Sequence, residues 1–190
     1  EKRMIPFTPE TEVEEVRMSF QMMKRYFPYK EELEWKNLRI SNIGLYSIIQ
    51  KKNADLILKI IEENFDNPAK ITLTDATGGV GGVAIYLAPY LKEVKLVEVV
   101  PLHAEMIESN LETYGIKNYK VYKSDYLQIM NRLAQDVVFF DPPWGGRGYG
   151  KNDKIDLGMN NIHIPCIINH LLMKDKANLV ILFCPHNFNF

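Results

Sequence analysis

An acid, two prolines and a tryptophan follow an apolar run in the stretch FFDPPWGGRGYG, residues 139–150. Pro142 and Pro143 fix their φ angles, so Asp141 and a proline carbonyl form two acceptors in a stiff segment. Two acceptors aimed at one point suit an aromatic amine, because accepting both of its hydrogens orients the nitrogen lone pair for attack on a methyl group. Trp144 adds a flat surface on which a nucleobase can stack. The alternative is a turn that ends a strand, with the tryptophan in the core.

A second candidate site is the glycine-rich stretch DATGGVGGVA, residues 75–84. Its glycines let the backbone turn tightly and approach a ligand, and Glu98, further along the chain, can accept the hydroxyl hydrogens of a ribose. The run from Gly79 to Ala84 also satisfies G-x-G-x-x-A, so a nicotinamide-dependent enzyme is one interpretation. Asp75 favours S-adenosyl-L-methionine instead, since that cofactor has an ammonium group and a ribose but no pyrophosphate. A tight turn without a ligand is the remaining alternative.

Ser124, Asp125 and Tyr126 form a third polar cluster at the end of an expected strand. Asp125 can accept a hydrogen bond from the amine of an adenine ring, and Tyr126 can cover the face of that ring. Ser and Asp are also preferred residues at the start of a helix, so a helix N-cap explains the same pattern.

These clusters follow β-rich runs that alternate with helical patterns. We expect strands at 71–75, 94–99, 119–125, 136–141 and 178–184, and helices at about 80–92, 102–114, 126–134 and 162–173. Such alternation predicts an α/β fold, a mostly parallel twisted sheet with helices on both faces. Ligands bind beyond the carboxyl ends of strands in such sheets, where the three clusters lie.

The N-terminal part lacks this alternation of strands and helices. Apolar residues at steps of three and four predict a helix over 9–27, followed by the aromatic arm YFPYKEELEW and a second helix over about 47–65. The apolar side of that second helix is expected to contain Ile49, Leu56, Ile57, Ile60 and Ile61. We therefore divide the chain into an N-terminal helical extension, residues 1–45, and a catalytic domain, residues 46–190.

Composition narrows the classes of function. The 190 residues are 46% hydrophobic and 25% charged, with a net charge of −1, as in an ordinary globular domain. No apolar run is long enough to span a bilayer, so we expect no membrane interaction. The two cysteines and the histidines lack metal-ligand spacing, which predicts no metal and free thiols in a reducing, intracellular compartment. We also expect a monomer. The near-neutral net charge argues against a protein that wraps long stretches of nucleic acid but allows one that binds a single nucleotide.

In this order, DATGGVGG, VEV, SDY and DPPWGG resemble the Rossmann-like class I methyltransferases that use S-adenosyl-L-methionine. The Asp-Pro-Pro-Trp-Gly-Gly version resembles the trimethylguanosine synthase family, which methylates guanine N2 of a 7-methylguanosine RNA cap. GLYSII (44–49) and CPHN (184–187) are similar to other segments of that family. Two strands usually follow the fifth in this fold, so the resemblance implies that the C-terminal strands are absent from this sequence.

The resemblance implies a role for each matching residue. Those expected to bind the cofactor are Asp75, Thr77, Gly79, Gly81, Glu98, Asp125 and Tyr126. The implied catalytic residues are Asp141, Pro142 and Trp144, and the implied contacts to capped RNA are Trp144, Arg147, Asn187, Tyr46 and Ser47. Alternatives are an amine methyltransferase for another base, such as adenine N6 or a guanine of ribosomal RNA, and a cap- or nucleotide-binding module without catalysis.

Overall fold

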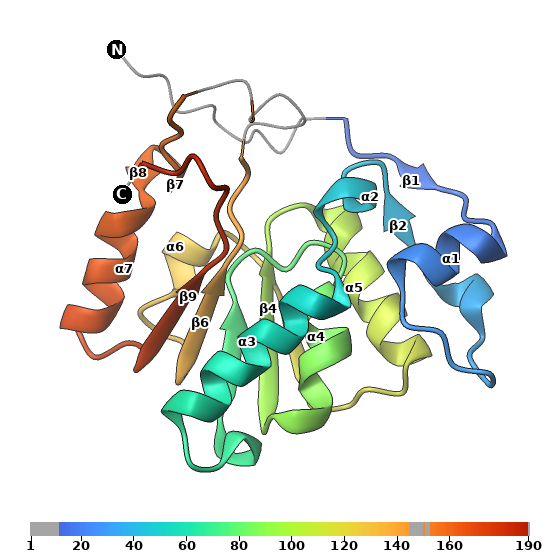
Figure 1. Ribbon diagram of the computed structural model, residues 1–190, viewed down its shortest axis with the longest axis horizontal. Coiled ribbons are helices and arrows are strands. Elements are labelled where there is room, and N and C mark those ends of the chain that lie inside the picture. Colours follow the sequence, from blue (N-terminus) through green and yellow to red (C-terminus); the bar gives the residue numbers. More distant parts are fainter. Residues whose placement is uncertain (1–11, 145–149, 151–152, 190) are drawn as a thin grey trace.

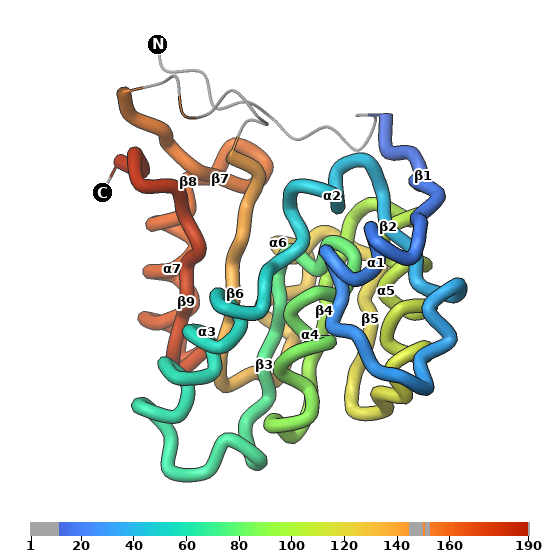
Figure 2. Tube along the Cα trace, turned by 45° about the vertical axis from the view of Figure 1, so that its right-hand side comes forward, coloured from blue at the N-terminus to red at the C-terminus, as the bar shows by residue number. Residues whose placement is uncertain are grey.

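Five parallel strands form the centre of the molecule. The computed structural model describes residues 12–144, 150 and 153–189. The strands are β3 (Thr72–Asp75), β4 (Glu93–Glu98), β5 (Tyr119–Lys123), β6 (Val137–Phe140) and β9 (Leu179–Leu182), in the order β5-β4-β3-β6-β9 (Figure 2). All four pairings are parallel, which confirms the predicted α/β fold. The strand order reverses at β3, so its carboxyl end is the switch point where such sheets bind ligands.

Helices cover both faces of this sheet. Alternate strand residues enter two apolar clusters: Val137 and Phe139 join one, and Val138 and Phe140 join the other. Helices α3 (Lys51–Asn64), α4 (Gly82–Leu87) and α5 (Pro101–Thr113) contribute to the first cluster (Figure 1). Helices α6 (Tyr126–Ile129) and α7 (Ile164–Met173) contribute to the second. A short helix η3 (Ala88–Tyr90) extends α4, and η2 (Pro68–Lys70) precedes β3.

The predicted helix over 9–27 is wrong for residues 12–19, and residues 1–11 lie outside the described part. Strand β1 (Glu15–Val16) pairs antiparallel with β2 (Ile40–Ser41), and helix α1 covers only Phe20–Tyr26. The helix begins there because the side chain of Ser19 accepts a hydrogen bond from the Met22 N–H, 3.3 Å away, and so caps its first turn.

The N-terminal part packs on the main core. Met23, Phe27, Leu38 and Ile40 are at most 5% exposed and belong to the same apolar cluster as the sheet. The short helix η1 (Trp35–Asn37) begins at the last residue of the arm. The division of the chain at residue 45 stays a prediction.

The predicted helix over about 47–65 corresponds to α3, which begins only at Lys51, and a separate short helix, α2 (Gly44–Ser47), precedes it. Leu56 is 56% exposed, contrary to the expected apolar side. Ala54 lines the buried face instead, together with Ile57 and Ile61.

Between β6 and β9 lies a small hairpin. Strands β7 (Gly158–Met159) and β8 (Ile162–His163) pair antiparallel, so the helix predicted from residue 162 begins at Ile164. Within the described residues, no helix has the length and apolar character that crossing a membrane requires.

Candidate active site

The loop after β3 carries the predicted glycines. Gly79 and Gly81 have φ angles of 54° and 90°, in the left-handed region where a side chain is strained. The Gly78 N–H donates to the carbonyl of Val97, 2.9 Å away, and so ties the loop to β4. The loop therefore has a fixed shape at the switch point of the sheet.

Glu98 ends β4 beside this loop and is 7% exposed. Its Oε2 accepts from the Gly79 N–H and its Oε1 from the Val100 N–H, both at 2.8 Å. Burial raises the pKa of Glu98 to about 7, against the opposing effect of these hydrogen bonds, and the nearby charge of Asp75 raises it further. The carboxylate is thus positioned by backbone groups on both oxygens.

Asp75 ends β3 and is 1% exposed. Its Oδ1 accepts from the Thr77 N–H at 3.0 Å and lies 3.4 Å from the Thr77 hydroxyl. Burial raises the pKa of Asp75 to about 7.

Asp141 follows β6, the other neighbour of β3, and is partly buried. Its backbone N–H donates to the Thr77 hydroxyl oxygen, 2.9 Å away. Burial raises the pKa of Asp141 to about 8; the charge of Asp75 adds to this effect, and a hydrogen bond from Trp144 opposes it. Thr77 therefore joins the loops after β3 and β6, a role different from the cofactor contact that the sequence predicts for it.

Trp144 is partly buried rather than enclosed in the interior. Its ring lies 5.4 Å from that of Phe183, centroid to centroid, with the planes tilted by 42°. Pro142 is buried and Pro143 is exposed. Sequence reasoning missed Phe183, although its place directly after β9 made it a candidate, because the fifth strand ends at the same edge of the sheet.

Asp125 and Tyr126, from the third predicted cluster, lie in different environments. The Oδ1 of Asp125 accepts from the Leu127 N–H at 2.9 Å and so caps α6, while its Oδ2 accepts from the side chain of Asn160. Tyr126 is 1% exposed, packs edge-on against Phe140, and its hydroxyl oxygen accepts from Gln135 at 3.0 Å. This position corrects the expectation that Tyr126 covers a ligand, because its ring lies within the core.

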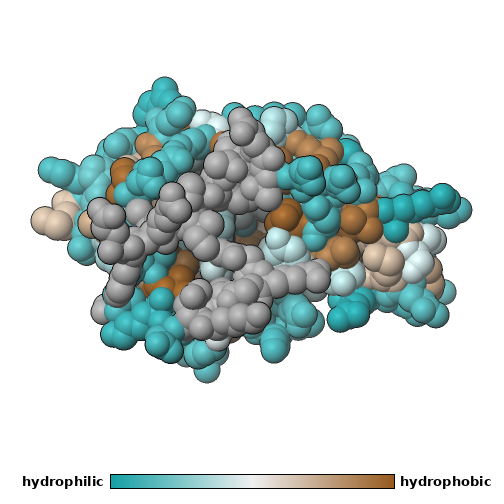
Figure 3. Space-filling model, turned by 90° about the horizontal axis from the view of Figure 1, so that it is seen from above, coloured by the Kyte–Doolittle hydropathy of each residue, from teal (hydrophilic) through white to brown (hydrophobic). Residues whose placement is uncertain are grey.

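The expected RNA contacts come from three places in the chain. Tyr46 is 49% exposed on α2, next to Ser47, whose hydroxyl donates to the Ile43 carbonyl at 3.0 Å. Asn187 is partly buried after β9, and its carbonyl accepts from the Ile155 N–H. Arg147 lies outside the described residues. Figure 3 looks onto this end of the molecule, where apolar patches (brown) lie within a mostly hydrophilic surface.

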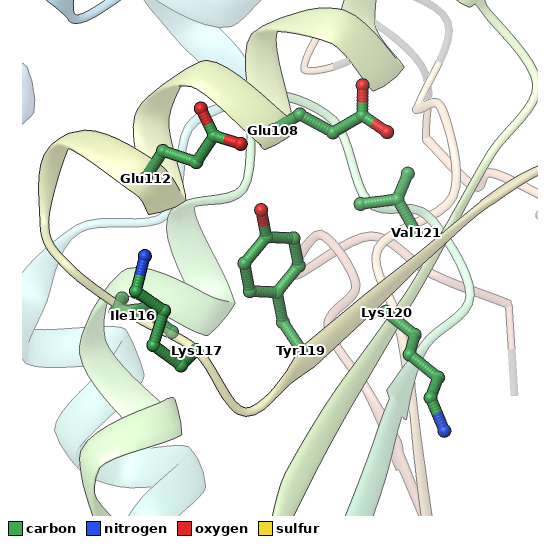
Figure 4. A pocket seen from close by; sticks show the side chains of 7 residues that line it. All are labelled: Glu108, Glu112, Ile116, Lys117, Tyr119, Lys120 and Val121. Carbon is green, nitrogen blue, oxygen red and sulfur yellow. The ribbon is translucent and has the colours of Figure 1, made fainter.

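A hollow of about 410 Å³ lies elsewhere, between α5 and the amino end of β5 (Figure 4). The hydroxyl of Tyr119 points there toward α5, which carries Glu108 and Glu112. None of the predicted site residues lines this hollow, so we do not assign the site to it.

Three carboxyl groups lie at the carboxyl ends of neighbouring strands, those of Asp75, Glu98 and Asp141, and, in addition to burial, the charge of Asp75 raises the pKa of each of the other two. In the described part of the chain, no lysine or arginine pairs with any of them, and no cluster of ligating side chains could hold a metal ion. Buried carboxylates without a cationic partner favour a cationic ligand. S-adenosyl-L-methionine fits this requirement, since it carries an ammonium and a sulfonium group.

The sheet and these strand ends define the class of the protein: it is a Rossmann-like class I methyltransferase with S-adenosyl-L-methionine as its cofactor. A hypothetical protein of Thermus thermophilus shares the fold, with a TM-score of 0.51 and 14% identity over 70% of this chain and 69% of its own. A family model described as RNA cap guanine-N2 methyltransferase matches residues 70–190. The chain belongs to that family, as the sequence motifs predicted.

Relatives of the chain include two trimethylguanosine synthases and one uncharacterized protein. The trimethylguanosine synthase of Schizosaccharomyces pombe is 36% identical over 152 residues, which cover 75% of this chain and 60% of the yeast protein. That of Saccharomyces cerevisiae is 28% identical and covers 80% and 54%. An uncharacterized protein of Acanthamoeba polyphaga mimivirus is 28% identical over 187 residues, 86% of this chain and 73% of its own. The chain thus spans little more than half the length of these two synthases.

Proposed function

We propose that the protein transfers a methyl group from S-adenosyl-L-methionine to the N2 amine of a 7-methylguanosine RNA cap. The observation that carries this proposal is a hydrogen-bonded link between the loop after β3, on the cofactor side, and the DPPW segment after β6. One hydroxyl, that of Thr77, contacts Asp75 on the cofactor side and the backbone of Asp141 on the DPPW side. An amine held by Asp141 would therefore lie next to the cofactor.

In this proposal Asp141 and the Pro142 carbonyl accept the two hydrogens of the guanine amine. The cofactor, when bound, supplies an electrophilic methyl group. The bond between the amine nitrogen and the methyl carbon would form as the carbon–sulfur bond of the cofactor breaks and leaves a neutral thioether. The alkylated nitrogen would be acidic enough to release one proton to solvent, so a strong base is not required. The pKa of Asp141, about 8 without ligands, means that cationic ligands also serve to ionise it.

Trp144 is assigned to the guanine base. Methylation at N7 makes the base cationic, so an indole face attracts it by cation–π interaction in addition to stacking. The contact of Trp144 with Phe183 fixes the tilt of the indole. Tyr46, Ser47, Asn187 and Arg147 remain proposed contacts to the rest of the capped RNA.

The cofactor is assigned to the adjoining strand ends. Glu98 would accept from the ribose hydroxyls, Asp75 would face the ammonium group, and Gly79 and Gly81 would line the loop. Asp125 would accept from the adenine amine through the acceptor sites that its bonds to Leu127 and Asn160 leave available.

The test is mass spectrometry of cap dinucleotides after incubation with S-adenosyl-L-methionine. We expect methyl groups to appear on the 7-methylguanosine cap analogue and at least about tenfold fewer on the unmethylated one. Asp141→Ala serves as the inactive control. Equal turnover of both analogues would favour an amine methyltransferase for another base. Binding of the cap analogue without any turnover would favour a binding module.

A further inference from the structure

Helix α5 carries a buried amide that joins the N-terminal part of the chain to the glycine loop. Asn110 is 0% exposed. Its Oδ1 accepts from the Arg39 N–H at 2.7 Å, and its Nδ2 donates to the carbonyls of Arg39 and Val80, each 2.9 Å away. Val80 belongs to the glycine loop. One side chain thus holds both the residue that precedes β2 and the backbone of that loop.

A second buried side chain of α5 makes a parallel link. His103 is 4% exposed, and its Nε2 lies 2.8 Å from the hydroxyl of Ser41 in β2. The Ser41 oxygen also accepts from the Gly44 N–H at 2.9 Å, and the tautomer of His103 sets whether the Ser41 hydroxyl donates to Nε2 or accepts from it. The other ring nitrogen, Nδ1, lies 4.0 Å from Oε1 of Glu98. Burial lowers the pKa of His103 to about 4, so the ring is neutral at pH 7.

Close packing supports the same connection. A Cβ added to Gly82, the first residue of α4, would lie 2.9 Å from Cγ1 of Ile48. A Cβ added to Gly44 would lie 2.8 Å from Cγ1 of Ile40 and 3.3 Å from Cγ1 of Val80. Residues 40–49 therefore rest directly against the glycine loop without room for another methyl group.

We propose that Asn110 and His103 are positioning residues that make cofactor affinity depend on the docking of residues 39–41 against α5. Asn110 holds the glycine loop, and the His103 ring packs between Ser41 and Glu98. The inference rests on the proposed placement of the cofactor between this loop and Glu98. It assigns a role to α5 that the contacts expected for the cofactor and the cap do not include.

The same helix and the turn that follows it offer matched controls. The Ser109 hydroxyl donates to the Asn37 carbonyl at 2.9 Å, and the Tyr114 hydroxyl donates to the Pro28 carbonyl at 2.6 Å. Ser109→Ala and Tyr114→Phe each remove one bond to the N-terminal part. Both bonds lead to residues 28 and 37, away from the glycine loop and from Glu98, so these variants leave the bonds of residues 39–41 to α5 intact.

The experiment is calorimetric titration with S-adenosyl-L-methionine, at a temperature where thermal melts show every variant folded. We expect Asn110→Ala to bind about tenfold more weakly than wild type and both controls to stay within about twofold. Hydrogen exchange should speed up at residues 78–83 in Asn110→Ala while β3 stays protected. A merely structural role would leave the affinity of the folded variant unchanged, or lower it equally in the controls, and either result overturns the inference.

A second variant keeps the test decisive if Asn110→Ala does not fold. Ser41→Ala removes the hydroxyl that sets the His103 ring and leaves α5 intact; we expect about threefold weaker cofactor binding. Wild-type affinity in this variant would overturn the role of His103. Wild-type protein that fails to bind S-adenosyl-L-methionine contradicts the proposed function itself, whereas normal wild-type binding with an unaffected Asn110→Ala contradicts only this inference.

Discussion

The proposed cofactor half and the proposed substrate half of the site are built in different ways. Asp75 and Glu98 are almost fully buried at the ends of central strands, and backbone N–H groups hold both oxygens of Glu98. Asp141 and Trp144 are only partly buried, and the indole packs beside Phe183 in the segment after β9. The first half takes its shape from the core of the sheet, so changes there affect folding and binding together. The second half is a small set of side chains, so changes there should alter chemistry and specificity alone.

The largest effect tests the substrate half. We expect Asp141→Asn to lower the methylation rate at least about a hundredfold, because the amide nitrogen donates where a carboxylate oxygen accepts. Its backbone bond to Thr77 is kept, so the affinity for S-adenosyl-L-methionine should change by no more than about threefold. Single-turnover rates and calorimetry measure the two quantities. A wild-type rate in this variant would refute the role given to the carboxylate.

Loss of the indole should separate the two halves most clearly. Trp144→Ala is expected to weaken binding of a 7-methylguanosine cap analogue by about ten- to a hundredfold, the usual worth of one stacked base. Cofactor affinity should stay within about twofold, and Trp144→Phe should fall between wild type and Ala. Fluorescence titration with the analogue and calorimetry with the cofactor give both values. Equal losses for both ligands would indicate a disturbed fold and remove the distinction between the halves.

The pH dependence of cofactor affinity tests the proposed cofactor half. Burial raises the pKa values of Asp75 and Glu98 to about 7, so below that pH they carry protons and attract a cation weakly. Binding of S-adenosyl-L-methionine should therefore release protons, and its affinity should rise about fivefold from pH 6 to pH 8. Calorimetry in two buffers of different ionisation enthalpy counts the released protons. Binding with no proton release would show that these carboxyl groups do not face the cation.

The same groups set the pH dependence of stability without ligands. Their folded pKa values exceed the unfolded ones, so the folded state holds protons that the unfolded chain releases. Their contribution is fully present below about pH 4 and is lost as the pH rises through about 7, or about 8 for Asp141. His103, whose folded pKa of about 4 is lowered, acts in the opposite direction as the pH rises from about 4 to 6.5.

The smallest effect concerns Asp125, which caps α6. Asp125→Ala should cost about 1 kcal/mol of stability, whereas Asp125→Ser keeps a capping oxygen and should melt close to wild type. If the carboxylate also accepts from the adenine amine, both variants bind the cofactor about threefold more weakly. Thermal melts and calorimetry on this pair separate the two roles, and unchanged affinity in Asp125→Ser would leave only the cap.

The central sheet could be predicted because each strand is a compact β-rich run with a helical pattern between it and the next. The N-terminal helix was wrong over residues 12–19 because β1 pairs with a strand more than twenty residues away, and helical periodicity carries no sign of such a partner. The burial of Tyr126 could not be read either, since an aromatic residue after an acid fits a core position as well as a binding site.

The expected carboxyl ends of the strands predicted that Asp75, Glu98 and Asp141 lie near the switch point, and the structure has them there. Strand ends alone could not predict the residues that join the loops. The hydrogen bond between Thr77 and Asp141 joins residues 64 positions apart, and that between Asn110 and Arg39 joins residues 71 positions apart. No sequence pattern around either side chain predicts its partner. Such contacts depend on how the helices and loops pack against the sheet in three dimensions.

The hydroxyl of Thr77 has an evolutionary consequence. A single oxygen accepts from the Asp141 backbone and lies beside the Asp75 carboxylate. A homologue with an apolar residue at position 77 must therefore supply another acceptor for that N–H. Position 141 contributes only its backbone to this contact, so covariation between positions 75 and 77 is the signature to look for across the family.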